Sequence, residues 1–397
     1  MSPETQDFIK KHWLDDVNAL ALAGCRDRAV DFRLALQQIR GLQKAAKKLP
    51  AHFAADGVLY PPALAMEQCS SWAAAQYKAS LLQGDTLVDL TGGFGVDTFA
   101  FASRFGTCVY VEPQQALCET VRHNAEAMHI SNVVFRCQTM EEYLQDAHPA
   151  DCLFADPSRR DCHGRRVVSI ADCTPDIVRH KETLLALARH AVMVKLSPML
   201  DIRDTLARLP ETAAVHIVAV EGECRELLIV LSHEPVRPEQ RPFVAVDIRN
   251  GKTVTFRFTP QEETEAHPLY ANETGKYLYE PNAALMKAGA FRSVAERYEL
   301  HKLHPNSHLY TSNTMLPDFP GRTFEVADAF TFGKKQCAER LKGIDAANVA
   351  VRNFPLTAPE LQKKLSLKDG GNLYLFGTML FGGQKVLLCC RKVTVEA

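Results

Sequence analysis

Ten residues set the architecture of this chain: Val88-Asp89-Leu90-Thr91-Gly92-Gly93-Phe94-Gly95-Val96-Asp97. They follow a short apolar run and open a segment with helical periodicity. Glycines at such a junction let the backbone turn tightly and approach a ligand closely, at dihedral angles that a side chain forbids. The segment lacks the Lys-Ser or Lys-Thr pair of a phosphate-binding loop, and its spacing differs from the dinucleotide fingerprint. Taken alone, it is also compatible with an ordinary junction of strand, turn and helix.

Around this segment, short apolar runs alternate with longer amphipathic segments. The runs cover residues 87–90, 108–111, 133–135, 152–155, 192–196, 215–220 and 227–231. Helical stretches separate the first five, a pattern that predicts a parallel sheet covered on both faces. Only residues 221–226 separate the last two, which favours an antiparallel pair. Residues 81–235 are therefore predicted to form an α/β, Rossmann-like domain with seven strands.

The flanking regions have different patterns. Residues 1–80 show apolar residues at three-to-four spacing and are predicted to form a helical segment. A proline-rich joint at Pro235, Pro238 and Pro242 closes the central domain. Residues 243–320 are expected to form a small α+β, ferredoxin-like domain that begins with strands at residues 243–248 and 253–258. Residues 321–397 are expected to form a second small module with the order strand, helix, strand, helix, strand, strand.

Composition limits the class of protein. Of the 397 residues, 46% are hydrophobic and 23% charged, as in a folded globular protein of several domains. The net charge is −1, yet residues 321–397 carry 12 Lys plus Arg against 7 Asp plus Glu, which suits an anionic partner. The 12 cysteines are scattered without metal-ligand spacing, which indicates a reducing cytoplasm and no metal. No apolar run is long enough to span a membrane.

Polar residues follow the next two strands. Glu112 ends the second apolar run, 17 residues after Gly95, where a carboxylate can accept hydrogen bonds from both ribose hydroxyls of an adenosine cofactor. Gln138-Thr139-Met140-Glu141 follows the third run. Met140 is a candidate contact for the adenine ring. The alternative at this position is a simple helix start capped by Thr139.

The fourth and fifth strands end in candidate catalytic residues. Asp156-Pro157-Ser158-Arg159-Arg160 follows the fourth run, and Lys195 lies near the end of the fifth. In a doubly wound sheet these strand ends face the ligand crevice beside the glycine loop.

Residues 81–235 resemble class I S-adenosylmethionine (SAM) dependent methyltransferases, nearest to the trimethylguanosine-synthase-like and bacterial RNA methylase groups. Asp156 and Pro157 match the family's catalytic motif, an Asp or Asn followed by Pro-Pro and often an aromatic residue. Ser158 replaces the second proline and Arg159 replaces the aromatic residue, which argues against methylation of an exocyclic amine. The resemblance implies that SAM is bound by Asp89, Thr91, Gly92, Gly93, Gly95, Asp97, Glu112, Met140 and Asp156, and that catalysis involves Asp156, Pro157, Ser158 and Lys195.

The C-terminal region, with residues 352–356 and 377–383, resembles a THUMP-like domain, and this resemblance implies a structured RNA substrate such as tRNA or rRNA. Arg159, Arg160, Arg165 and Arg166 beside the expected crevice are predicted to bind RNA phosphates. The alternative is a solvated loop whose arginines pair with nearby acidic residues.

Two further arrangements bear on the methylated atom. Lys78, Asp156, Lys195 and Glu221 could form a set similar to that of ribose 2′-O-methylases, in which a lysine deprotonates the hydroxyl. The simpler interpretation, which the sequence favours, places Lys78 on a solvent-facing helix surface. Cys162 could be the nucleophile of a pyrimidine methylase, but its spacing does not fit. Two other functions stay open: an RNA-binding protein with an inactive methylase core, and a methylase of small molecules or proteins.

Overall fold

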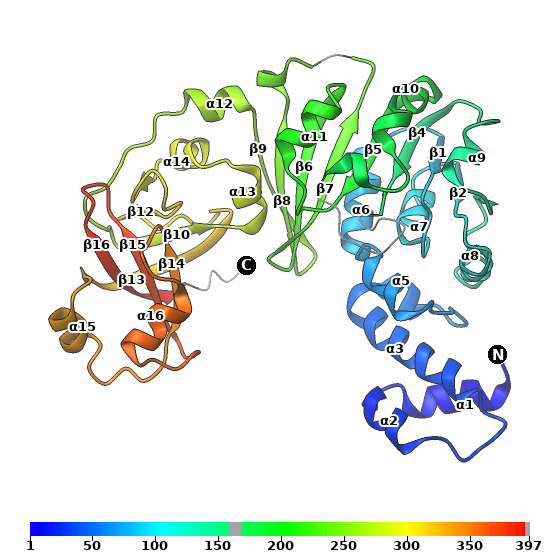
Figure 1. The fold of residues 1–397 in the computed structure, drawn as a ribbon, viewed down its shortest axis with the longest axis horizontal. Helices are drawn as coiled ribbons and strands as arrows, with labels where there is room; N and C mark the ends of the chain where they lie inside the picture. Colours follow the sequence, from blue (N-terminus) through cyan, green and yellow to red (C-terminus); the bar gives the residue numbers. More distant parts are fainter. Residues whose placement is uncertain (159–168, 235, 394–397) are drawn as a thin grey trace. The chain divides into compact units, whose positions relative to one another are not determined.

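The computed structural model describes residues 1–158, 169–234 and 236–393. The chain forms two compact units (Figure 1). Unit 1 contains Met1–Val215 and Glu226–Val236, and unit 2 contains His216–Arg225 and Arg237–Ala397. No helix among the described residues is both long enough and apolar enough to cross a membrane.

Unit 1 begins with a helical segment, as the periodicity predicted. Its helices are α1 (Pro3–His12), α2 (Val17–Ala23), α3 (Phe32–Lys48), α4 (Pro50–Ala54), α5 (Ala63–Gln68) and α6 (Trp72–Leu81). Side-chain caps fix several of their starts, among them Asp31 on the backbone N–H of Leu34 and Ser71 on that of Ala74. Ile9 and Ile39 lie in a small apolar cluster that packs α1 against α3.

The large sheet has nine strands rather than the expected seven. They are β1 (Thr86–Asp89), β2 (Thr107–Val111), β3 (Val133–Arg136), β4 (Ala150–Ala155), β5 (Ala188–Leu196), β6 (Thr212–Val220), β7 (Glu223–Leu231), β8 (Phe243–Arg249) and β9 (Lys252–Phe258), in the order β3-β2-β1-β4-β5-β7-β6-β8-β9. The first seven in this order make up the predicted core. The sequence assigned β8 and β9 to a separate small domain, because their pattern shows that they are strands but not which sheet they join.

Strand direction gathers the predicted site at one edge of this sheet. β1 pairs in parallel with β2 and β4, and β4 pairs in parallel with β5. Their carboxyl ends therefore meet, which brings together Asp89, Glu112, Asp156 and Lys195. β7 runs antiparallel to β5. Helices α7 (Val96–Ala102), α8 (Gln115–Ala127), α9 (Met140–Tyr143), α10 (Ile177–Leu187) and α11 (Ile202–Arg208) connect the strands.

Unit 2 contains a second sheet of seven strands, in the order β11-β12-β10-β13-β16-β15-β14. These are β10 (Tyr277–Pro281), β11 (His301–Lys302), β12 (Tyr310–Ser312), β13 (Gly321–Thr331), β14 (Asn348–Arg352), β15 (Leu373–Met379) and β16 (Lys385–Lys392). Its helices are α12 (Pro260–Glu265), α13 (Ala283–Ala288), α14 (Arg292–Arg297), α15 (Lys334–Arg340) and α16 (Ala358–Leu365). From β13 onward the elements follow the predicted order, and Thr357 and Glu360 form a capping box at α16.

Candidate active site

The glycine loop between β1 and α7 needs its glycines for steric reasons. Gly93 has φ 53° and Gly95 has φ 76°, both in the left-handed region. A Cβ atom on Gly92 would lie 2.2 Å from the ring of Tyr110. The Tyr110 hydroxyl donates a 2.6 Å hydrogen bond to the carbonyl of Gly93. A side chain is therefore excluded at Gly92 by the packing of the loop against β2, and at Gly93 and Gly95 the backbone conformation favours glycine.

Glu112 holds the same loop from the end of β2. One of its carboxylate oxygens accepts a 3.1 Å hydrogen bond from the N–H of Gly93, and the other accepts a 3.0 Å bond from the N–H of Gln114. The residue is buried. Each oxygen can accept a second hydrogen bond. A buried carboxylate fixed beside a glycine loop fits the ribose of an adenosine cofactor.

Asp89 and Thr91 connect the loop to the end of β4. Asp89 is fully buried and accepts hydrogen bonds from the Thr98 hydroxyl at 2.6 Å and the Thr91 N–H at 3.1 Å. Burial raises the pKa of Asp89 to about 7, although these bonds partly oppose the rise. The Thr91 hydroxyl accepts a 2.6 Å bond from the N–H of Asp156. The glycine loop and the end of β4 are thus held in one arrangement.

The segment after β3 begins a helix. Thr139 and Glu142 form a capping box at the start of α9, which matches the alternative reading of this segment as a helix start. Met140 is buried, 3% exposed. Its contact with the adenine ring stays a prediction.

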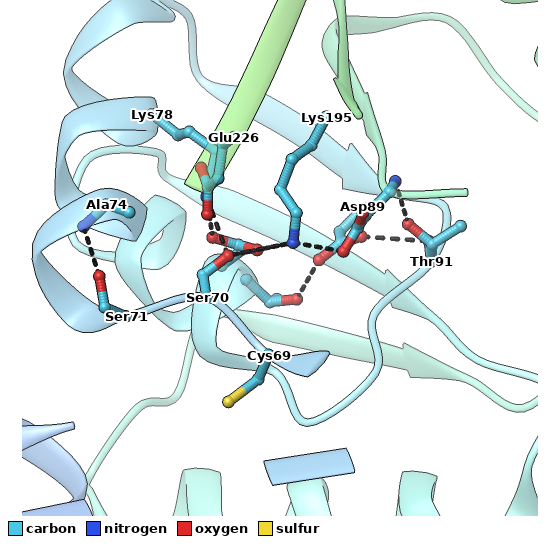
Figure 2. Close-up of polar contacts among 12 residues, drawn as sticks. Cys69, Ser70, Ser71, Ala74, Lys78, Asp89, Thr91, Lys195 and Glu226 are labelled. Atoms are coloured by element: carbon cyan, nitrogen blue, oxygen red, sulfur yellow. Dashed lines mark hydrogen bonds and ion pairs between the residues drawn. The ribbon is translucent and has the colours of Figure 1, made fainter. Parts of the chain in front are cut away.

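A buried network of charged side chains lies behind these motifs. Lys78 of α6 is fully buried, and its ammonium contacts Glu226 at 2.6 Å, Asp97 at 3.1 Å and the Ser70 hydroxyl at 2.9 Å. Figure 2 shows the side chains of Lys78 and Lys195 converging on Ser70 from different elements. The Ser70 hydroxyl donates a 2.7 Å hydrogen bond to Asp97. The hydroxyl of Ser70 therefore joins both ammonium groups to one carboxylate.

Lys195 extends this network toward the surface. Its ammonium donates to Ser70 at 3.2 Å, lies 3.9 Å from Asp97, and forms a short ion pair with Asp156. The side chain of Asp156 is 33% exposed, compared with 9% for Lys195 and 11% for Asp97. Asp156 is therefore the most exposed side chain of the network.

The network carries an excess of negative charge. It contains three carboxylates, from Asp97, Asp156 and Glu226, and two ammonium groups, from Lys78 and Lys195. Burial lowers the pKa of Lys195, but Asp156, Asp97 and Glu226 outweigh it and hold that pKa above its ordinary value. Burial raises the pKa of Asp156, which Lys195 only partly offsets. A buried site with one surplus negative charge favours a cationic ligand such as a sulfonium.

The pKa of Asp97 shifts in the opposite direction to that of Asp156. Burial would raise its pKa, but the two lysines and the hydrogen bond from Ser70 hold it below its ordinary value. The sequence predicted Asp97 as a cofactor ligand. In the structure its carboxylate contacts these side chains, so a direct contact with the cofactor stays a prediction.

The structure corrects two expectations about this set. Lys78 was expected on a solvent-facing surface and is instead fully buried. Glu221 was the expected acidic partner, but it is exposed and accepts a hydrogen bond from the N–H of Asn250. The acidic partner of Lys78 is instead Glu226, which directly precedes the apolar run of β7. The signal was present, because side chains alternate along a strand and Glu226 therefore lies on the same face as Leu228 and Val230 of the apolar run.

The remaining predicted residues follow Asp156. Pro157 is buried, and the backbone of Ser158 pairs with Thr174. Arg159, Arg160, Arg165 and Arg166, with Cys162, lie outside the described residues. Ser70 was not predicted at all, because a serine before a helix cap has no distinguishing pattern.

Two families match parts of unit 2. A family described as a ferredoxin-like domain matches residues 277–320. A family described as THUMP domain-like matches residues 321–392, the region for which the sequence indicated this resemblance.

Comparison with whole proteins identifies the class. A crystal structure from Porphyromonas gingivalis W83, assigned to the methyltransferases, is 34% identical and covers 98% of each chain with a TM-score of 0.87. Two relatives named as uncharacterized S-adenosylmethionine-dependent methyltransferases, from Mycobacterium tuberculosis strains CDC 1551 / Oshkosh and H37Rv, are each 23% identical over 322 residues, 80% of this chain and 84% of theirs. The chain belongs to the class I SAM-dependent methyltransferases that carry a C-terminal THUMP-like domain. It is an enzyme, and SAM is its methyl donor.

Proposed function

We propose that this enzyme methylates a nucleotide in a structured RNA, either a tRNA or an rRNA. The observation that carries the proposal is the THUMP-like match over residues 321–392. The C-terminal region that includes it holds 12 basic against 7 acidic residues in a chain whose net charge is −1. A basic module on a slightly acidic enzyme suits a polyanionic substrate.

SAM would be held by the residues at the carboxyl edge of the large sheet. Gly92, Gly93 and Gly95 would accommodate the methionine portion, Glu112 the ribose hydroxyls and Met140 the adenine ring. SAM supplies a methyl group activated by the positive charge of its sulfonium. The surplus negative charge of the network that ends in Asp156 would favour this cation over an uncharged analogue.

The acceptor nucleotide would meet the methyl group at Asp156. This carboxylate is fixed by Lys195 and by the hydrogen bond from the Asp156 N–H to Thr91. Pro157 and Ser158 would shape the wall of the crevice. Catalysis would come mainly from holding the acceptor atom in line with the methyl group and from excluding water. Arg159, Arg160, Arg165 and Arg166 belong to this proposal as phosphate contacts.

The test is transfer of labelled methyl groups to RNA. The purified full-length enzyme is incubated with methyl-labelled SAM and total RNA from cells that lack its gene. We expect label in one RNA species, and far less in RNA from unmodified parent cells, where the same position is already methylated. Asp156→Ala should abolish the transfer. Equal labelling of the two RNA samples, or labelling of proteins or small molecules alone, would contradict the proposal.

The site of action is proposed to be the cytoplasm. Eleven cysteines in the described part of the chain are free, in agreement with a reducing compartment.

A further inference from the structure

The charged network carries information about the atom that receives the methyl group. In the proposed site Asp156 would face the acceptor, and its carboxylate is already paired with the ammonium of Lys195. Lys195 in turn is held by Ser70 and lies within 3.9 Å of Asp97. Any acceptor that reaches Asp156 therefore approaches a fixed positive charge as well as a carboxylate.

The network as a whole has one surplus negative charge, but the group that contacts Asp156 is the ammonium of Lys195, and its charge discriminates between acceptors. A neutral amine that attacks the methyl group becomes cationic in the transition state, so an adjacent ammonium opposes the reaction. A hydroxyl behaves in the opposite way, because it must lose its proton and its oxygen gains negative charge as it attacks. For a hydroxyl, Lys195 stabilises the developing charge and Asp156 offers an acceptor for the proton.

Methylation of a carbon atom requires a different group. That chemistry commonly begins with attack by a cysteine thiolate. Cys69 adjoins Ser70, but burial raises the pKa of its thiol, an effect that Lys48 only partly offsets. Among the described residues around Ser70, the groups placed for proton transfer are carboxylates and ammonium groups rather than a thiolate.

We propose that the methyl acceptor is a hydroxyl oxygen, and that on an RNA substrate it is the 2′-hydroxyl of a ribose. This inference rests on the proposed RNA methylation. As the new C–O bond forms, the bond between sulfur and the methyl carbon breaks and leaves a neutral thioether. The O–H bond breaks in the same step, and its proton passes to a carboxylate oxygen of Asp156. Because Asp156 is partly exposed, the proton can then leave to solvent.

Asp156 and the residues behind it have separate roles in this step. Asp156 would contact the acceptor hydroxyl and act as the catalytic residue, and Lys195 would act through its ion pair with Asp156 as a positioning residue. Ser70 and Asp97 lie next to the ammonium of Lys195. Lys78 contacts Ser70 and Asp97, and Glu226 contacts Lys78, so all four would act as positioning residues. This division explains why a network of five charged side chains extends so far beneath one exposed carboxylate.

The location of the label tests the proposal. RNA from cells lacking the gene is treated with the enzyme and methyl-labelled SAM, digested to nucleosides, and analysed by mass spectrometry that separates base fragments from sugar fragments. We expect the label on a sugar. Label on a base would overturn this inference while supporting RNA methylation. An enzyme that binds SAM but labels no RNA would overturn the proposed function, and this inference with it.

A change in the substrate provides a check that does not depend on protein folding. Once the labelled nucleotide is known, the RNA is synthesised with a single 2′-deoxy substitution at that position. Transfer should vanish while binding of this RNA to the enzyme is retained. Continued transfer to the 2′-deoxy RNA would contradict a 2′-hydroxyl acceptor.

Variants of Lys195 test its role with a readout other than activity. Lys195→Met should reduce the rate of transfer by about 100- to 10,000-fold. Its SAM affinity by calorimetry should stay at least equal to that of wild type, because the change removes a positive charge near the sulfonium. Lys195→Arg, which keeps the charge, should recover part of the rate. Loss of SAM binding together with transfer would make Lys195 a structural residue and overturn this assignment.

A matched control comes from the same unit. Lys181 forms an ion pair with Glu211 at 2.7 Å, near the surface. Lys181→Met should leave transfer and SAM binding unchanged, which separates the effect of losing an ion-paired lysine from the effect of losing Lys195.

Discussion

Both units place carboxylates against more than one cation, and the two clusters differ in composition. In unit 1, three carboxylates surround two lysines, and most of these side chains are buried. In unit 2, one oxygen of the buried Glu280 carboxylate accepts hydrogen bonds from two nitrogens of Arg322, and the other oxygen accepts one from Arg352 at 2.5 Å. The arginine side chains are 38% and 37% exposed.

The two clusters differ in charge balance, and each balance suits a different kind of ligand. The network of unit 1 has surplus negative charge and suits the sulfonium of SAM. The cluster of unit 2 has surplus positive charge on exposed guanidinium groups, which suits phosphate. Glu280 of β10 also ties the ferredoxin-like region to Arg322 and Arg352 of the THUMP-like region. The network of unit 1 holds most of its charges away from water, whereas the cluster of unit 2 exposes its two guanidinium groups to solvent.

The largest effect should come from removing the most deeply buried cation. Lys78→Met leaves Asp97 and Glu226 buried without their main partner. We expect a loss of about 3–5 kcal/mol in the free energy of unfolding, measured by urea denaturation monitored on the full chain. The double variant Lys78→Met/Glu226→Leu should recover part of this loss. A cost below about 1 kcal/mol for the single variant would show that the network tolerates unpaired charge.

A buried titratable group without an ionic partner should behave differently within the same unit. His52 is fully buried, both its ring nitrogens lack hydrogen-bond partners in the described part of the chain, and burial lowers its pKa to about 4 from 6.5. Between pH 6.5 and pH 4, His52 is mostly protonated in the unfolded chain but mostly neutral in the folded protein. The free energy of unfolding therefore shows no loss from His52 above pH 6.5. It falls by about 3 kcal/mol as the pH decreases toward 4.

The measurement is urea denaturation of wild type and His52→Phe between pH 7 and pH 4. The variant should lose less stability over this range than wild type, because its side chain cannot be protonated. Parallel curves for the two proteins would show that His52 does not cause the pH dependence.

The smallest of the three effects should appear in unit 2. Glu280→Gln removes the charge of the carboxylate that the two arginines share. Because both arginines can turn toward water, we expect a loss of only about 2 kcal/mol in the free energy of unfolding. The variant frees positive charge, so RNA should bind more tightly at low salt and with a steeper salt dependence. Filter binding across a salt series measures this. Unchanged affinity and slope would indicate that Arg322 and Arg352 are structural and do not face RNA.

The sequence predicted those parts of the site that depend on strand ends. Asp89, Glu112, Asp156 and Lys195 each follow or close an apolar run, so the parallel topology alone brings them together. The network behind them could not be found in this way. Lys78 and Ser70 come from α6 and the loop before it, and no local pattern distinguishes a buried lysine from an exposed one on an alanine-rich helix. Its burial depends on partners that are distant in the chain.

The number of strands illustrates the same limit for the fold. Residues 243–248 and 253–258 were correctly predicted as strands, because alternation of apolar residues is a local property. Which sheet they extend depends on their pairing with β6, and a proline-rich joint before them suggested a boundary instead. Local periodicity thus predicted the elements, whereas long-range pairing decided their sheet.

The most direct measurement is the binding of SAM to wild-type enzyme and to Glu112→Ala by isothermal titration calorimetry. The predicted site places the ribose of SAM against the carboxylate of Glu112, beside the glycine loop. We expect micromolar binding to the wild-type enzyme and strongly weakened binding to the variant, with unfolding temperatures checked for both. Equal SAM affinity in the two proteins would contradict this placement of the donor.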